Sequence, residues 1–129
     1  MRLPFSLGFV PDEQANIIFE KTGLDVFGFE RLLDNFGIRH AFKHHGNDET
    51  EEARGQIGIK PIDFERIALI LEMPDFIKLD GKNRLGNDVL VFQKNLEARY
   101  FFVAEIRTGR RLLALQTFYK QKIRPTLAG

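Results

Sequence analysis

The pattern of apolar and polar positions divides the chain into a helical first half and a strand-rich second half. In the first half, apolar residues recur every three or four positions, which is the spacing of one helix face. With start and stop residues at the ends, this spacing predicts helices over residues 11–23, 36–45 and 60–75. A short strand is predicted before them, at 3–10, and the glycine-punctuated stretch 23–37 predicts one short helical turn.

The second half is rich in β-branched and aromatic residues, which favour strands. Strands are predicted at the start of 76–88 and over 89–94, 99–106 and 112–120, with turn residues between them. Helices followed by antiparallel strands are typical of an α+β domain. We therefore predict a single α+β domain, residues 1–129, in which N-terminal helices pack on a C-terminal antiparallel sheet.

The last two predicted strands form a hairpin whose register decides which side chains meet. If Thr108 and Gly109 are the two loop residues, Tyr100 falls opposite Thr117. Because strand side chains alternate between faces, Thr117 and Tyr119 then share one sheet face with Tyr100. Hydroxyls and aromatic rings on one face suit RNA, although Tyr and Thr are also simply good strand formers.

Composition narrows the class of protein. A length of 129 residues favours one domain, and 43% apolar residues with 13 Phe are enough to bury a core. The chain has no Cys, which excludes disulfides and thiolate metal sites. No apolar run approaches membrane-spanning length, and the N-terminal stretch lacks the apolar core and cleavage site of a signal peptide.

Charge is unevenly distributed along the chain. The net charge is +1, but the segment 99–124 carries seven Lys or Arg against one acid, Glu105. Clustered basic residues are the source of phosphate contacts in RNA-binding proteins. On charge alone, a solvated basic edge is the favoured interpretation of the same cluster.

All three histidines of the chain, His40, His44 and His45, fall within six positions. On a helix, His40 and His44 share a face, which makes them a possible zinc half-site. The third ligand would be Asp48, Glu49, Glu51 or Glu52. The metal-free alternative is a ribonuclease, which needs a base for the 2′-OH, an acid for the departing 5′-oxygen and donors for the phosphate. The residues alone leave both alternatives open.

The order of motifs resembles one family, the phage-associated nucleases of the barnase–EndoU–colicin–RelE group. The resemblance rests on "GIRHAFKHHGN", "RGQIGI", a helix starting "KPIDFERI", "MPDFI" and a final strand ending "LQTFYK", and it covers roughly residues 20–122. It implies N-terminal helices packed on an antiparallel sheet of about four strands, and RNA cleavage without a metal or other cofactor.

The resemblance also implies roles for individual residues. His40 matches the first family histidine and His45, directly before Gly46, matches the second, which leaves His44 outside the pattern. Arg54 and Gln56 fall on the Arg-Gly-Gln element, and Thr117, Tyr119 and Lys120 fall on the final strand. We expect His45, His40, Thr117 and Tyr119 to be catalytic, and Arg54, Gln56, Lys120 and Tyr100 to bind substrate.

The leading hypothesis is a metal-independent endoribonuclease whose partner is RNA, with tRNA as one candidate. The site of action would be the cytoplasm, reached by a phage particle or a secretion system. A potent nuclease would also need an inhibitor protein in its producer, and a basic face suits an acidic partner. The alternatives are a non-catalytic module that binds RNA or protein, and a zinc-dependent hydrolase.

Overall fold

The computed structural model describes residues 5–47 and 56–123, apart from the side chains of Phe36, Phe42, Gln56 and Ile57. Its first half contains β1 (Phe5–Phe9), α1 (Asp12–Thr22), β2 (Glu30–Leu33), α2 (Asn35–His45), β3 (Gln56–Ile57), the 3₁₀ helix η1 (Pro61–Arg66) and α4 (Ile67–Glu72). The second half contains β4 (Phe76–Lys82), β5 (Asp88–Asn95), β6 (Arg99–Arg107), the 3₁₀ turn η2 (Thr108–Arg110) and β7 (Leu112–Gln121). The α+β class predicted from the sequence is confirmed.

The strands form one sheet, ordered β1-β2-β7-β6-β5-β4, with the short β3 also paired to β7. All of these pairs are antiparallel except β2 with β7, which is parallel. The prediction of about four antiparallel strands is therefore wrong in detail, because the sheet of the described residues is larger and mixed. The missed strand β2 lies where one helical turn was predicted, and β7, far along the chain, supplies its hydrogen-bond partners.

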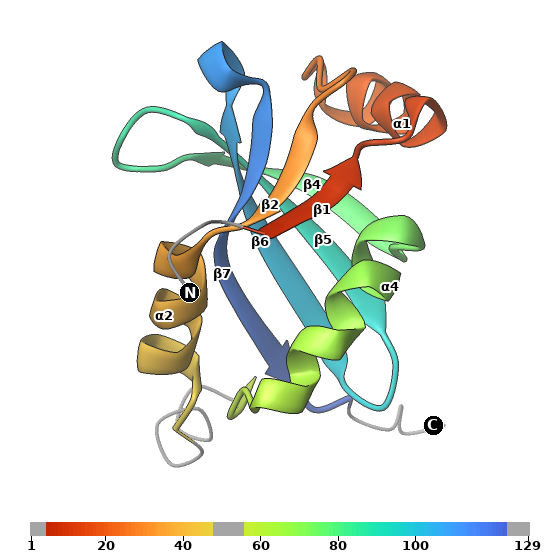
Figure 1. Cartoon of the computed structure of the whole chain (residues 1–129). Helices are drawn as coiled ribbons and strands as arrows, with labels where there is room; N and C mark the ends of the chain where they lie inside the picture. The colour runs from red at the N-terminus through yellow and green to blue at the C-terminus, as the bar shows by residue number, and fades with distance from the viewer. Residues whose placement is uncertain (1–4, 48–55, 124–129) are drawn as a thin grey trace.

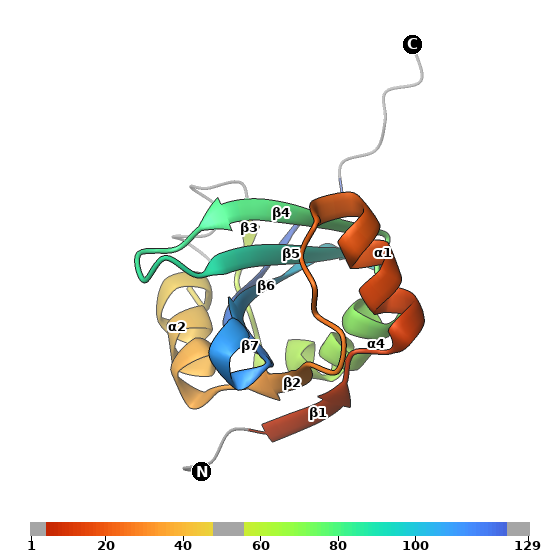
Figure 2. The ribbon, with the colours of Figure 1, turned by 90° about the horizontal axis from the view of Figure 1, so that it is seen from above.

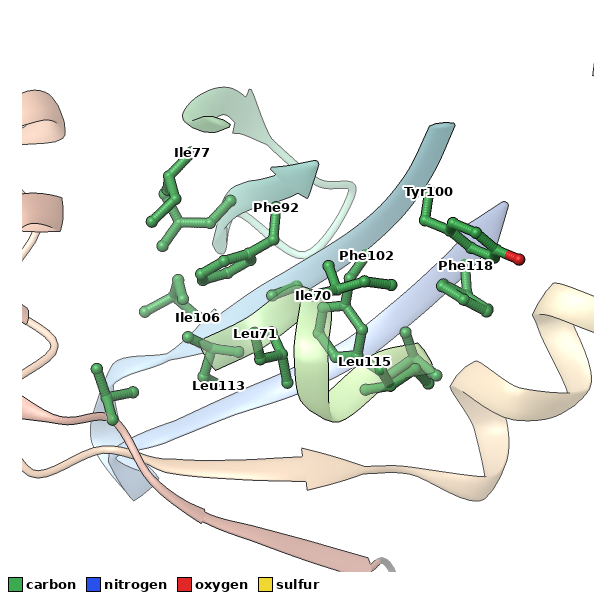
Figure 3. Close-up of a cluster of buried hydrophobic side chains, with 14 of the residues drawn as sticks. Ile70, Leu71, Ile77, Phe92, Tyr100, Phe102, Ile106, Leu113, Leu115 and Phe118 are labelled. Carbon is green, nitrogen blue, oxygen red and sulfur yellow. The ribbon is translucent and has the colours of Figure 1, made fainter. Parts of the chain in front are cut away.

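Most of the hydrophobic core lies between one face of the sheet and the helices α1 and α4, and Ala41 of α2 also belongs to it. Figure 2 shows these two helices on one side of the curved sheet and α2 on the other. In Figure 3, Ile70 and Leu71 of α4 lie among strand side chains such as Phe92, Phe102 and Leu115. All five are fully buried, so the tight packing here stabilises the strands that carry the site. No helix in the described part of the chain is long and apolar enough to span a membrane.

Helix α2 lies alongside β7, as Figures 1 and 2 show. Gly37 permits this close approach: a Cβ at this position would lie 2.1 Å from the backbone oxygen of Leu115. Any larger residue would push the helix away from the strand. The same helix carries the three histidines, so Gly37 helps to bring them next to the final strand.

The β6–β7 hairpin differs from the prediction in two ways. Its loop is longer than two residues, because Arg107 pairs with Leu112 and the chain between them forms η2 followed by Arg111 with a φ of 57°. Further along, the register skips Gln116, which forms a bulge in β7.

Together the loop and the bulge move the pairing by three residues, so Tyr100 lies opposite Lys120 rather than Thr117. A shift by an odd number changes the face on which a residue lies relative to its partner strand. Tyr100 therefore joins Phe118 in the core, and the prediction that it shares a face with Thr117 and Tyr119 is wrong.

Candidate active site

The outer face of the sheet, away from the core, carries a row of aromatic rings that ends on α2. Phe101 of β6 stacks on Tyr119 of β7 with 4.6 Å between ring centroids, and His45 lies tilted against Tyr119 at 5.2 Å. These contacts fix the Tyr119 ring and leave its hydroxyl as the group that can act. Burial, followed by the charge of Asp80, raises the pKa of Tyr119, so this hydroxyl is a donor at neutral pH.

Phe101 is a residue of this row that sequence reasoning missed. The correct register pairs it directly with Tyr119. The only sequence signal was its alternation with Tyr100, and the predicted register assigned the outer face to Tyr100 instead.

Thr117 lies on the same outer face, paired with Val103. Its hydroxyl oxygen is buried and has no hydrogen-bond partner within the described part of the chain. A buried hydroxyl without a partner costs about 1–3 kcal/mol. A ligand that reached this hydroxyl after a local movement would supply the missing hydrogen bond.

His40 faces a pocket of about 510 Å³ beside the aromatic row. The pocket lies between α2, the β4–β5 loop and the bulge of β7, and its lining includes Leu85, Glu105, Leu115 and Gln116. Partial burial lowers the pKa of His40, and the charges of His44, His45 and Lys43 lower it further. His40 is therefore neutral at pH 7, as a general base must be.

His44 contacts His40, with 4.3 Å between the ring centroids. It lies outside the family pattern, yet it affects the site because its positive form disfavours a proton on His40. On a regular helix, His40 and His45 point to different sides. Helix α2 continues to His45, and the two residues lie near different parts of β7: His40 lines a pocket with Gln116 of the bulge, and His45 contacts the Tyr119 ring.

Tyr100 and Lys120, both expected to bind substrate, lie together on the core side of the sheet. The Lys120 ammonium is 2.8 Å from the Asp63 carboxylate. The Tyr100 hydroxyl lies 3.0 Å from Asp63 and 2.7 Å from Glu97. Burial, then the hydrogen bonds to Glu97 and Asp63, raise the pKa of Tyr100. This Tyr100–Asp63–Lys120 cluster is internally paired, and it is separated from Thr117 and Tyr119 by the sheet.

Two further predicted site residues are described partly or not at all. Gln56 is in β3, where its backbone pairs with Gln121 of β7, and its side chain is not described. Arg54 lies outside the described residues. Their roles remain predictions.

The zinc half-site also remains a prediction. His40 and His44 are adjacent, but the acids proposed as third ligand, at 48–52, lie outside the described residues. Within the described ranges, no group of three or more His, Asp or Glu is arranged to hold a metal ion.

Much of the basic C-terminal charge is used inside the fold. Arg107 pairs with Glu105 at 2.6 Å and with Asp34 at 3.2 Å, and Lys120 pairs with Asp63. Arg111 donates a hydrogen bond of 2.6 Å to a backbone carbonyl. The excess of positive charge in the sequence therefore overstates the positive charge available to a ligand.

Comparison with known proteins gives one match. A family model described as phage-Barnase-EndoU-ColicinE5/D-RelE like nuclease3 matches residues 8–125. No curated protein and no solved structure matches the chain. The matched range runs from β1 to beyond the end of β7, so it includes α2 and every residue of the aromatic row.

Proposed function

The chain belongs to the phage-Barnase-EndoU-ColicinE5/D-RelE like nuclease3 family, and we propose that it is a metal-independent endoribonuclease. The observation that supports this function is the position of α2 along β7. It brings His40 and His45 next to the strand that carries Thr117 and Tyr119. Acid–base groups thus lie beside hydroxyl donors, which is the combination that metal-free RNA cleavage requires.

The reaction is an attack within the RNA backbone. The 2′-oxygen forms a bond to phosphorus as the 2′-OH proton leaves to a base. The bond from phosphorus to the 5′-oxygen breaks, and an acid protonates that oxygen. The products are a 2′,3′-cyclic phosphate and a free 5′-OH, so no water or cofactor enters this step.

The two histidines divide this proton transfer between them. His40, whose lowered pKa keeps it neutral, accepts the proton from the 2′-OH. His45 donates a proton to the 5′-oxygen. The two residues are five positions apart, about 7.5 Å along a helix axis. Because the two residues also diverge around the helix, the proposal requires the phosphate to lie over β7, between the pocket that His40 lines and the Tyr119 ring that His45 contacts.

The hydroxyls of Thr117 and Tyr119 hold the phosphate. The buried Thr117 hydroxyl, which has no partner within the described part of the chain, gains one from a non-bridging oxygen. Tyr119 stays protonated because of its raised pKa and donates to the same phosphate. The Tyr119 ring is held in place by Phe101 and His45 before substrate binds, whereas the Thr117 hydroxyl becomes available only when a local movement exposes it.

The test is cleavage of total tRNA and of an unstructured RNA, each with and without EDTA. Wild-type protein should cleave in both conditions and leave 2′,3′-cyclic phosphate ends. His45→Ala should not cleave, whereas Arg39→Ala, an exposed control on the same helix, should behave as wild type. Cleavage that EDTA abolishes would transfer the function to a metal site, and binding without cleavage would leave a non-catalytic RNA-binding module.

A further inference from the structure

We propose that the pocket beside His40 is a nucleobase subsite that favours guanine. This inference rests on the proposed ribonuclease function, because the pocket adjoins the groups assigned to the scissile phosphate. Gln116 lines the pocket and directly precedes Thr117, and His40 lines the pocket from α2. A base bound here would therefore belong to a nucleotide next to the cleaved bond.

The apolar part of the pocket suits a flat ring. Leu85, at the tip of the β4–β5 loop, forms one side, and Leu115, which is 1% exposed, contributes only to the base of the pocket. Leu85 is 80% exposed, the largest exposed fraction among the large apolar residues described. A purine ring placed against Leu85 would cover it and fits readily within about 510 Å³.

The polar part of the pocket presents donors, and a chain of hydrogen bonds explains why. The side-chain oxygen of Asn83 accepts bonds from the backbone N–H groups of Leu85 and Asn87, both 3.0 Å long. Its Nδ2 group must therefore face the sheet, where it donates to Glu105 and to Oε1 of Gln116. Gln116 thus uses its oxygen within the fold, and its Nε2 donors are the atoms left for a ligand.

Glu105 lies in the same pocket but offers little as an acceptor. Arg107 donates to one of its oxygens at 2.6 Å, and Asn83 and Asn87 donate to the other. Burial opposes ionisation of Glu105, but the bonds from Asn87, Arg107 and Asn83 outweigh it and lower its pKa. The carboxylate is therefore charged and already accepts three hydrogen bonds, and its role is to hold the donors in place.

A pocket that presents donors selects a base that presents acceptors. Guanine carries two adjacent acceptors, O6 and N7, on one edge, whereas uracil offers the single acceptor O4 there and adenine and cytosine each place an amino donor on it. Arg84, which also lines the pocket, adds further donors at its rim. The lining thus matches the O6/N7 edge of guanine better than the edges of the other bases.

The experiment measures binding separately from cleavage. The 3′-monophosphates of guanosine, adenosine, cytidine and uridine are titrated into the wild-type protein, with the methyl signals of Leu85 and Leu115 followed by NMR. The guanine nucleotide should bind most tightly and shift both signals. Leu85→Ala should weaken its binding about fivefold, and Leu79→Ala, an exposed leucine off the pocket, should leave it unchanged.

Gln116→Glu is the sharper variant, because a carboxylate still accepts from Asn83 but turns an acceptor toward the ligand. Guanine binding should fall at least about tenfold relative to adenine. An equal loss for all four nucleotides, or shifts that spare Leu85 and Leu115, would overturn the subsite. Guanine-selective binding without RNA cleavage would retain the subsite and reject the ribonuclease. Cleavage by the wild type with no base preference, unaltered in Leu85→Ala, would reject the subsite and retain the ribonuclease.

Discussion

The two faces of β7 carry two polar clusters that are built in opposite ways. On the core face, Lys120 belongs to the Tyr100–Asp63–Lys120 cluster, in which every member has a charged or hydrogen-bonding partner. On the outer face, Thr117 has a buried hydroxyl with no partner within the described residues, and Tyr119 lies against His45. Lys120 thus belongs to a cluster whose polar groups are paired with one another. Its neighbour Tyr119 shares the outer face with the Thr117 hydroxyl, which has no hydrogen-bond partner within the described residues.

In the proposed function, the two faces of β7 divide stability and catalysis between them. Buried polar groups that satisfy one another hold the end of β7 in place and have no capacity left for a ligand. The outer face retains an unsatisfied hydroxyl and a histidine kept neutral by its surroundings. Substitutions on the two faces should therefore affect different quantities.

The largest expected effect is on the outer face. His45→Ala should lower the rate of RNA cleavage by about two to four decades, the usual contribution of an acid–base group. Its melting temperature should change little, because His45 is only partly buried. Single-turnover cleavage and thermal denaturation of the same preparation measure both quantities. A large loss of stability with unchanged cleavage would reverse the assignment of the faces.

On the core face, Lys120→Met should act on stability instead. The variant leaves the Asp63 carboxylate, which is 4% exposed, without its cation. Removing one partner of a buried ion pair costs about 3–5 kcal/mol. Urea denaturation should show a loss of this order, while folded protein at low temperature should cleave RNA at close to the wild-type rate. A stable variant with lost cleavage would return Lys120 to the substrate-binding role that the sequence suggested.

Thr117→Val tests whether the unsatisfied hydroxyl serves the ligand. Valine has a similar shape and no hydroxyl, so stability should be unchanged or higher by about 1 kcal/mol. Cleavage should fall about tenfold, the usual effect of losing one hydrogen bond to a charged group. Denaturation midpoints and steady-state rates provide the comparison, with Val103→Thr on the facing strand as a control for the change in polarity. A less stable variant would mean that the hydroxyl has a structural partner.

The smallest effect is on the dependence of stability on pH. The pKa of His40 is lower in the folded protein than its ordinary value of 6.5, so the unfolded chain binds its proton more readily. The contribution of His40 to stability is therefore full above pH 6.5 and is lost as the pH falls through the folded-state pKa. The free energy of unfolding should decline less steeply between pH 7 and 5 in His40→Gln than in the wild type. Equal slopes would contradict the lowered pKa.

Local sequence determined the secondary structure wherever neighbouring residues decide it. The helix starts and stops around 11–23 and 36–45 correspond to α1 and α2, and the β-rich segments correspond to β5, β6 and β7. The segment 60–75 is helical as predicted, but its first half is the 3₁₀ helix η1. The strand β2 was not predicted, because only its pairing with β7 makes it a strand.

The sequence also contained the histidines and the Thr-x-Tyr-Lys ending, and the family that they suggested is confirmed. Their arrangement was decided by tertiary structure. A longer turn and one bulge at Gln116 changed the β6–β7 pairing by three residues, which moved Tyr100 into the core and brought Phe101 to Tyr119. Side chains alternate along a strand, so local propensity specifies that a segment is extended, whereas only the register specifies which of its residues reach the site.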